Sequence, residues 1–257
     1  MQHFLGVVAI CKNEAHVIDE WLEHYRNEGV TSFLVIDNGS TDDTVARLST
    51  HVDVVVVEDG ARHAQASLYN KYANLLSCEW ILVVDLDEFL YGSTVPVGEV
   101  LRSLPDDVGA VNIPWLCFGS SRHVQQPESV VEGFLWRAAY PADQPPYNAG
   151  CKEAVRRRAV DRLELHLHAL IGDYRKVDDC LQPFNGTIRI SECRVDSAAL
   201  RLNHYVIQSL AYYRSVKMTR GDAASPGADH VRDDAYFARA DKNEVHDDRL
   251  LSKRRAK

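Results

Sequence analysis

Short apolar runs alternate with helical segments through the first third of the chain. Runs of strand length, rich in Val and Ile, lie at residues 4–10, 32–36, 52–57 and 80–84. The segments between them, at residues 15–26, 42–48 and 64–76, have helical patterns. Gly29 is expected to end the first helix. Unbroken apolar strands separated by helices predict a parallel sheet covered on both faces.

The rest of the chain is less regular. Residues 109–115 and 200–206 are expected to be strands, and residues 141–150 a turn-rich loop. From Gln208 onward the pattern is helical and increasingly polar, with a loop near residues 224–227. No internal repeat or linker is visible, so one domain of 257 residues with C-terminal helices is the simplest organisation.

The charge balance restricts what the chain can bind. Lys and Arg total 29 and Asp and Glu total 37, a formal net charge of −8. An acidic chain is not expected to bind nucleic acid. To bind a diphosphate, it would need isolated cations or a bound metal to supply the positive field.

Cysteine usage and hydropathy bear on the cellular compartment. The six cysteines include no C-x-x-C pair, and no apolar run approaches the roughly 20 residues of a membrane span. Charge follows the first apolar run too soon for a secretory leader, so we expect a cytoplasmic protein with reduced thiols. The basic tail with Lys253, Arg254 and Lys257 allows at most peripheral contact with the inner face of a membrane.

Polar and acidic side chains gather where three predicted strands end, at residues 11–14, 37–40 and 85–88. In an open parallel sheet, ligands bind at the carboxyl ends of the strands. Asp85 and Asp87 leave their strand as alternate residues, so both carboxylates can face one point. Because such a pair is costly without a cation, and Mg²⁺ or Mn²⁺ suits oxygen ligands, the pair predicts a metal site.

Other phosphate-binding and catalytic motifs are absent. The chain has no G-x-G-x-x-G, G-x-x-x-x-G-K-[ST], G-x-S-x-G or H-E-x-x-H. His166 and His168 form an H-x-H pair with no Cys or carboxylate at a recognised spacing, so we expect structural or exposed imidazoles there. Without a glycine-rich loop, neutralising a diphosphate would fall to the metal and to single cations.

A set of short motifs occurs along the chain, at residues 11–14 (CKNE), 20–24, 37–42 (DNGSTD), 85–89 (DLDEF), 118–121, 203–205 and 217–221. Together they resemble the family 2-like and family 92 glycosyltransferases over nearly the whole chain. The resemblance implies an α/β fold of the GT-A (Rossmann-like) type, with a mostly parallel central sheet flanked by helices and a C-terminal helical extension. It also implies a nucleotide-sugar donor, with UDP-sugars favoured, and Mn²⁺ or Mg²⁺.

The same resemblance divides the chain and assigns a donor pocket. Residues 1–115 would form the nucleotide-sugar-binding half, residues 116–207 the acceptor-side half and residues 208–257 the C-terminal helices. Asn13, Glu14 and Asp37 would line the nucleoside pocket, where a carboxylate can accept from a uracil N–H or a ribose hydroxyl. Gln65 and Asn70 would face the donor from the helix before the fourth strand.

The resemblance also implies how the diphosphate is held. Asp85 and Asp87 would bind the metal, and His204 would complete its shell or contact the phosphates. Lys217 and Arg220, three residues apart on one predicted helix face, would neutralise the leaving diphosphate. They stand where the commonest family 2 pattern has Gln-x-x-Arg-Trp, which leaves the geometry of these contacts open.

Inversion at the anomeric carbon is the implied mechanism, with a base that deprotonates the acceptor hydroxyl during attack. The base should be an acid beyond the fifth strand: Glu132 is preferred, then Glu153, with Asp173 in the same region. Aromatic and hydroxyl residues at 115–121 are expected on the acceptor side, because aromatic faces stack on sugar rings. The acceptor would be a glycan or a lipid-linked glycan.

Three other functions share parts of this pattern. A Mg²⁺-dependent phosphatase of the haloacid dehalogenase kind would carry its aspartate pair after the first strand, where this chain has CKNE. A nucleotidyltransferase would show a glycine- and lysine-rich first loop. A noncatalytic glycan-binding domain would keep the pocket but would not need Asp85, Asp87 and His204 intact.

Overall fold

A nine-stranded sheet runs through the computed structural model, which describes residues 3–141, 150–221 and 232–256. In spatial order the strands are β3 (Val54–Glu58), β2 (Ser32–Asp37), β1 (His3–Cys11), β4 (Cys78–Val83), β8 (Cys151–Arg156), β6 (Val108–Cys117), β12 (Leu200–His204) and β5 (Glu88–Gly92), and β11 (Arg175–Asp178) pairs with β6. Five strand pairs are parallel, and the three antiparallel pairs all involve β8 or β5. The sheet is therefore mostly parallel, as predicted.

The first block follows the predicted alternation. Helix α1 (Ile18–Asn27) separates β1 from β2, α2 (Thr44–Leu48) separates β2 from β3, and α3 (Gln65–Tyr72) with the 3₁₀ turn η1 (Ala73–Leu75) precedes β4. Gly29 ends α1 as predicted: it has φ +95, and the next residue, Val30, donates its N–H to the Tyr25 carbonyl at 2.9 Å.

Later elements were only partly predicted. The expected strands at 109–115 and 200–206 correspond to β6 and β12, whereas β5, β8 and β11 were not predicted. Helices α4 (Val97–Arg102), α5 (Val130–Gly133) and α6 (Glu192–Ser197) and the 3₁₀ turn η2 (Arg157–Ala159) belong to this part. Two separate antiparallel strand pairs complete it: β9 (Val160–Arg162) with β10 (Ala169–Leu170), and β7 (Trp136–Arg137) with the distant β13 (Val245–His246). The loop predicted at 224–227, and residues 142–149 of the loop predicted at 141–150, lie outside the described residues.

The predicted C-terminal helices are confirmed. They are α7 (Leu210–Tyr212), the π-helix η3 (Tyr213–Lys217), α8 (Asp234–Ala240) and α9 (Arg249–Arg255). The fold class expected from the sequence, an α/β fold with a mostly parallel sheet, flanking helices and a C-terminal helical extension, is therefore correct.

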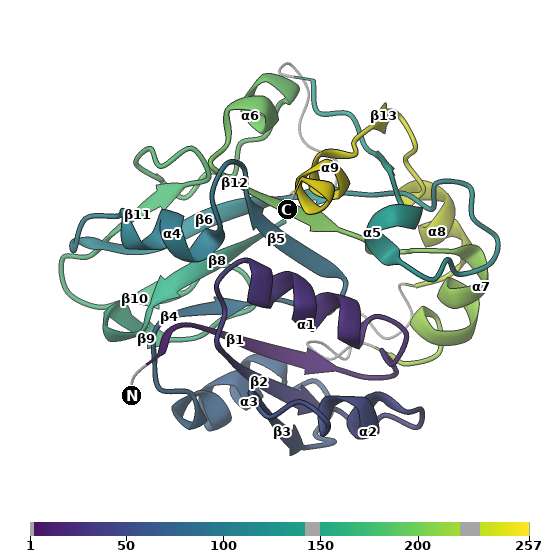
Figure 1. Cartoon of the computed structure of the whole chain (residues 1–257), viewed down its shortest axis with the longest axis horizontal. Helices are drawn as coiled ribbons and strands as arrows, with labels where there is room; N and C mark the ends of the chain where they lie inside the picture. The colour runs from purple at the N-terminus through teal and green to yellow at the C-terminus, as the bar shows by residue number, and fades with distance from the viewer. Residues whose placement is uncertain (1–2, 142–149, 222–231, 257) are drawn as a thin grey trace.

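Helices cover both faces of the sheet, which explains why β1 is apolar from Phe4 to Cys11. Val7 of β1 packs into a core with α1, α4 and α9, and α1 and α9 lie side by side in front of the sheet (Figure 1). The next residue, Val8, points to the other face and packs with α3 and η1. A strand buried on both faces cannot alternate apolar with polar residues.

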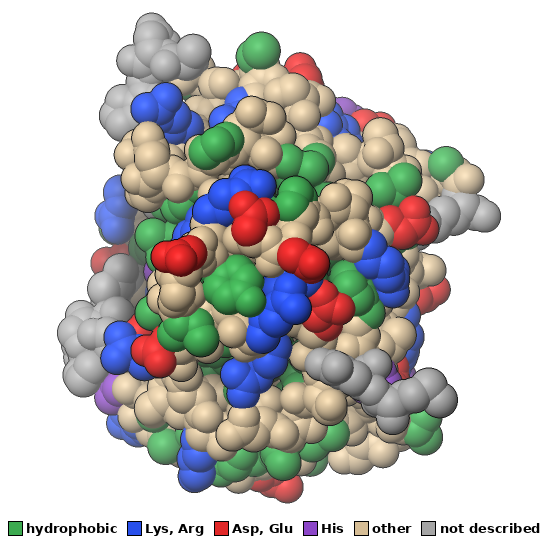
Figure 2. All heavy atoms as spheres, turned by 90° about the vertical axis from the view of Figure 1, so that its left-hand side faces the viewer, with side chains coloured by type: hydrophobic (Ala, Val, Ile, Leu, Met, Phe, Trp, Pro, Cys, Tyr) green, Lys and Arg blue, Asp and Glu red, His purple; other side chains and the backbone are tan. Residues whose placement is uncertain are grey.

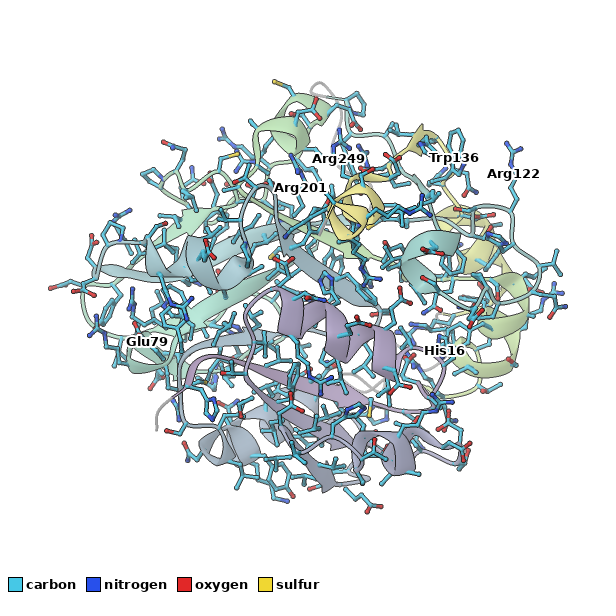
Figure 3. The ribbon with its side chains drawn as sticks, in the orientation of Figure 1. His16, Glu79, Arg122, Trp136, Arg201 and Arg249 are labelled. Atoms are coloured by element: carbon cyan, nitrogen blue, oxygen red, sulfur yellow. The ribbon has the colours of Figure 1, made fainter. Side chains whose placement is uncertain are left out.

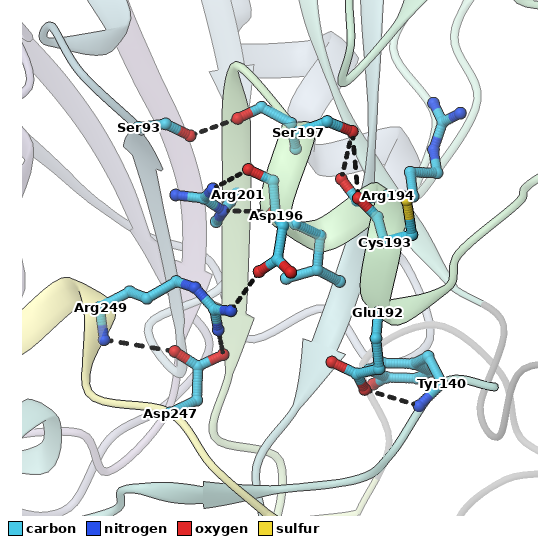
Figure 4. A network of polar contacts seen from close by, with 12 residues as sticks. Ser93, Tyr140, Glu192, Cys193, Arg194, Asp196, Ser197, Arg201, Asp247 and Arg249 are labelled. Atoms are coloured by element: carbon cyan, nitrogen blue, oxygen red, sulfur yellow. Dashed lines mark hydrogen bonds and ion pairs between the residues drawn. The ribbon is translucent and has the colours of Figure 1, made fainter.

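Ion pairs fasten the C-terminal segment to the rest of the fold. Asp247 accepts from the Arg249 guanidinium at 2.6 Å, and Arg249 also contacts Asp196 beyond β11, in α6 (Figure 4). Asp247 accepts a second time, at 2.6 Å, from Arg137, a fully buried arginine that also pairs with Glu192. Buried arginines of this kind need such partners to be tolerated.

The side of the molecule where the parallel strands begin carries many paired charges. Glu79, near the start of β4, and His16, beyond the end of β1, lie on opposite sides of the molecule (Figure 3). On the side where the parallel strands begin, acidic and basic side chains lie next to one another (Figure 2), in pairs such as Arg175 with Asp107 at 2.6 Å.

All six cysteines are free thiols, and none of the helices among the described residues is long and apolar enough to cross a membrane.

Candidate functional site

A cavity of about 530 Å³ opens where the parallel strands end. Residues following β1, β2, β3 and β4 line it, because parallel strands finish at the same edge of a sheet. β8 runs the other way, so its first residues, including Lys152, come to this edge too. The prediction that polar strand ends meet at one place is therefore confirmed for residues 11–14, 37–40 and 85–88.

The acidic pair lies in the connection from β4 to β5. Asp85 accepts hydrogen bonds from Gln65 Nε2 at 3.1 Å and from Lys152 Nζ at 2.9 Å. Asp87 is held from behind, since its carbonyl accepts from the Tyr205 N–H at 2.8 Å. Asp85, Asp87 and Gln65 line the cavity, so the structure brings these three predicted residues together.

Asp87 lies between two cationic or basic groups. The Lys217 ammonium contacts its Oδ2, and His204 Nε2 lies 3.7 Å from its Oδ1. Burial alone would raise the pKa of Asp87, but Lys217 and His204 outweigh burial and hold it below its ordinary value. Burial lowers the pKa of His204 to about 4, so its imidazole is neutral at neutral pH and can act as a metal ligand.

Asp87 and His204 fit a shared cation. Two ligands of one cation at about 2.1 Å each lie about 3 to 4 Å apart, which includes the 3.7 Å observed here. Nδ1 of His204 is buried without a partner among the described residues. Asp85 faces the same cavity, but its oxygens are drawn towards Gln65 and Lys152, and the three groups do not converge as a preformed three-ligand cluster within the described chain.

Lys152 was not predicted from the sequence. Its ammonium lies 2.9 Å from Asp85 Oδ2 and 3.6 Å from Glu88 Oε2, and its side chain is 3% exposed. Burial would lower the pKa of Lys152, but the two acids outweigh it and raise the pKa. Burial raises the pKa of Glu88 far above its ordinary value. No spacing rule points to this lysine, because only the reversed direction of β8 brings it here.

Glu14 and Arg220 line the cavity as an ion pair. The Arg220 guanidinium contacts Glu14 Oε1 and donates to the Lys12 carbonyl at 3.1 Å. The other carboxylate oxygen of Glu14 accepts from the Tyr212 hydroxyl at 2.8 Å. Glu14, Lys12 and Arg220 line the cavity, and Lys217 reaches Asp87 from behind it.

The expected helix geometry of Lys217 and Arg220 is wrong. Lys217 closes a π-helix, in which the Met218 N–H donates to the Tyr213 carbonyl, and Arg220 lies in the turn after it. The spacing of three therefore does not place them on one α-helical face.

Asn13 and Asp37 shape the pocket from below its surface. Asp37 is 2% exposed, and its Oδ2 accepts from the Gly39 and Ser40 N–H groups at 3.0 Å each. Asn13 has φ 56, and its Oδ1 accepts from the Thr41 N–H at 2.7 Å. These contacts hold two neighbouring loops, of which Asn38 and Gly39 reach the cavity.

None of the acids considered as the base lines the cavity. Glu132 lies in α5, where its exposed carboxylate is 3.7 Å from Arg255. Glu153 is buried, accepts from the His168 N–H at 2.7 Å and pairs with Lys176 at 2.9 Å. Asp173 is exposed beyond β10. These positions give none of the three access to a hydroxyl bound in the cavity.

The segment at 115–121 divides between cavity and core. Trp115 lines the cavity, and its ring centroid lies 4.4 Å from that of His204. Phe118 and Ser120 are buried, at 1% and 2% exposed, away from it. Only Trp115 of this segment is therefore placed to contact a bound sugar.

Comparison with known proteins agrees with the resemblance seen in the sequence. Residues 6–99 match the sequence profile of Glycosyl transferase family 2. A glycosyltransferase family 92 protein of Oryza sativa subsp. japonica is 26% identical over 153 residues, which cover 54% of this chain and 26% of that protein. The chain thus spans about a quarter of the length of this curated relative.

Solved structures with partial similarity include a mannosyltransferase and a synthase. One is a mannosyltransferase from Pyrobaculum calidifontis in complex with GDP-Man and Mn²⁺, 25% identical, with a TM-score of 0.36 and coverage of 44% of this chain and 36% of that one. The other is a glucosyl-3-phosphoglycerate synthase from Mycobacterium tuberculosis, 22% identical, with a TM-score of 0.32 and 44% of each chain covered. By the profile match and the family 92 relative, part of this chain is similar in sequence to glycosyltransferases of family 2 and family 92.

Proposed function

We propose that the chain is a metal-dependent glycosyltransferase of the GT-A fold, which moves a sugar from a nucleotide-diphosphate donor to a hydroxyl group. One observation carries the proposal: a chain with a net charge of −8 concentrates five cations beside three carboxylates, Glu14, Asp85 and Asp87, in one cavity. The cations on its walls are Lys12, Arg62, Lys152, Arg220 and Arg232. This combination suits a diphosphate with a divalent cation, because each supplies the charge that the other needs.

One group of residues would bind the metal, and another would stabilise the leaving diphosphate. Asp87 and His204, with Asp85 on the same wall, would hold Mn²⁺ or Mg²⁺, which when bound supplies positive charge beside the diphosphate oxygens. Lys152 and Arg220 would stabilise the charge that grows on the leaving diphosphate.

Finer features of the proposal come from the family. UDP-sugars are the favoured donors, the reaction inverts the anomeric carbon, and the acceptor is a hydroxyl of a glycan or of a lipid-linked glycan in polysaccharide biosynthesis. Residues 1–115 would bind the donor, residues 116–207 would contact the acceptor and residues 208–257 would supply Lys217 and Arg220. We place the reaction in the cytoplasm, with at most peripheral contact with the membrane.

Calorimetric titration tests the donor site. UDP and GDP are each titrated with Mn²⁺ and with chelator, into the wild type and into Asp87→Asn. We expect one nucleotide to bind only with Mn²⁺, and Asp87→Asn to weaken it at least about tenfold, or about 1.4 kcal/mol. Asp107→Asn, which alters an exposed carboxylate near the start of β6, is the matched control and should bind like the wild type.

The alternatives give other results. A folded wild type that binds neither nucleotide would exclude the transferase and favour a phosphatase or a glycan-binding domain. Nucleotide affinity that is the same with Mn²⁺ and with chelator, and the same in the wild type and in Asp87→Asn, would favour a noncatalytic domain. Release of pyrophosphate from a nucleoside triphosphate would identify a nucleotidyltransferase.

A further inference from the structure

The carboxylates that line the cavity are engaged by other groups. Both oxygens of Asp85 accept hydrogen bonds, and both oxygens of Glu14 contact Tyr212 or Arg220. Asp87 is bound by Lys217 on one oxygen and faces His204 with the other. A base for an acceptor hydroxyl therefore has to come from another kind of side chain.

His166 lines the same cavity and has a defined tautomer. Its Nδ1 lies 2.9 Å from the Cys151 carbonyl oxygen, which can only accept, so Nδ1 carries the proton. Nε2 of a neutral ring then holds a lone pair. No hydrogen bond engages Nε2 within the described residues, and the side chain is exposed at the cavity wall.

The ring is oriented by its neighbours. Trp115 packs against His166 at a centroid distance of 5.3 Å and an interplanar angle of 75°, and its own centroid lies 4.4 Å from that of His204. The imidazole is thus one aromatic ring away from the site proposed for the metal. Desolvation lowers the pKa of His166 below its ordinary value, so the neutral form dominates at neutral pH.

The loop that carries His166 is fixed at both ends. Before it, the Leu163 N–H and carbonyl bond to the Asn70 side chain, at 2.9 and 2.8 Å. After it, the His168 N–H donates to Glu153 at 2.7 Å, and Lys176 Nζ donates to the His168 carbonyl at 2.7 Å. Asn70 and Glu153, which the sequence placed in the donor and base roles, instead position this loop.

We infer that His166 is the catalytic base of the transfer reaction, with Nε2 as the proton acceptor; the inference rests on the proposed function. As the acceptor oxygen bonds to the anomeric carbon, the bond from that carbon to the diphosphate oxygen breaks. The acceptor proton passes to His166 Nε2 and then to solvent, and the nucleoside diphosphate leaves with the bonding electron pair.

His166→Gln separates catalysis from binding. The probes are UDP-glucose and GDP-mannose with Mn²⁺, water serves as acceptor, and free sugar is measured beside nucleotide binding by calorimetry. We expect sugar release to fall at least about 100-fold, the low end for loss of a general base, while nucleotide affinity stays within about threefold. Imidazole added to His166→Gly should restore part of the rate. His246→Gln, a change at an exposed histidine in β13, is the control.

Three results would overturn the inference. Sugar release by His166→Gln at the measured wild-type rate excludes the base while leaving the donor site intact. Nucleotide affinity that falls as much as the rate makes His166 a donor-binding residue. Nitrogen NMR shifts that place the ring proton on Nε2 remove the required lone pair. A wild type that binds no nucleotide instead overturns the proposed function itself, together with the base.

Discussion

The first block of the sheet, from β1 to β4, and the later part, from β5 to β12, build the cavity in different ways. In the first block every neighbouring pair of strands is parallel, and the acids follow directly after strand ends. In the later part β8 and β5 run in the opposite direction. Lys152 and His166 reach the cavity from this irregular part, and Lys217 reaches Asp87 from the C-terminal π-helix.

The difference shows how one cavity combines charges of opposite sign. Parallel strands deliver the same end of each strand to one edge, so acids there repel each other unless cations arrive by another route. The antiparallel strand β8 supplies such a route, since it begins at the edge where its neighbours end. Lys12 and Arg62 of the first block also line the cavity, but the ion pairs of Asp85, Asp87 and Glu14 are made by Lys152, Lys217 and Arg220 of the later chain.

The largest expected effect comes from breaking this neutralisation. Lys152→Met should lower the free energy of unfolding by about 3–5 kcal/mol, because it leaves Asp85 and buried Glu88 without their shared cation. Urea denaturation would measure the loss. Lys152→Met combined with Glu88→Gln should recover part of it. Equal losses in the single and double variants would contradict a charge-based cause.

The sequence predicted the first block and its acids because their signals are local. An apolar run followed by Asp85 and Asp87 needs no knowledge of the rest of the fold. The position of Lys152 depends on strand direction and register, which a single sequence does not encode locally.

The base was missed for a related reason. Glu132 and Glu153 were chosen by residue type and position in the chain, but side-chain contacts decide which group is accessible. The Glu153 carboxylate accepts hydrogen bonds from the His168 N–H and from Lys176 Nζ. His166 and His168 differ in their surroundings: His166 lines the cavity, whereas His168 is buried, at 3% exposed.

An effect of intermediate size tests the burial of His168 through the pH dependence of the free energy of unfolding. Burial first, then the charge of Lys176, lowers the pKa of His168 to about 3, against about 6.5 when unfolded. The unfolded chain therefore binds a proton that the folded chain does not, and stability falls as pH drops below about 6.5. The expected slope is about 1.4 kcal/mol per pH unit, or about 2 kcal/mol between pH 6.5 and 5. His168→Gln should flatten the slope in urea denaturation at each pH; an unchanged slope would assign it to other groups.

The smallest expected effect tests whether a local signal, Gly29, sets the end of helix α1 in the first block. Gly29 has φ +95, which side chains with a Cβ rarely adopt, although an added Cβ would meet nothing closer than the Gly98 Cα at 3.4 Å. Gly29→Ala should therefore cost about 1 kcal/mol through backbone strain alone. Gly60→Ala is the matched control, because Gly60 has no positive φ and its Cβ would meet nothing within 4 Å. Chemical denaturation should leave Gly60→Ala within about 0.5 kcal/mol of the wild type, the usual range for a surface change. Equal stabilities for the two variants would mean that the end of α1 is set by tertiary packing rather than by its glycine.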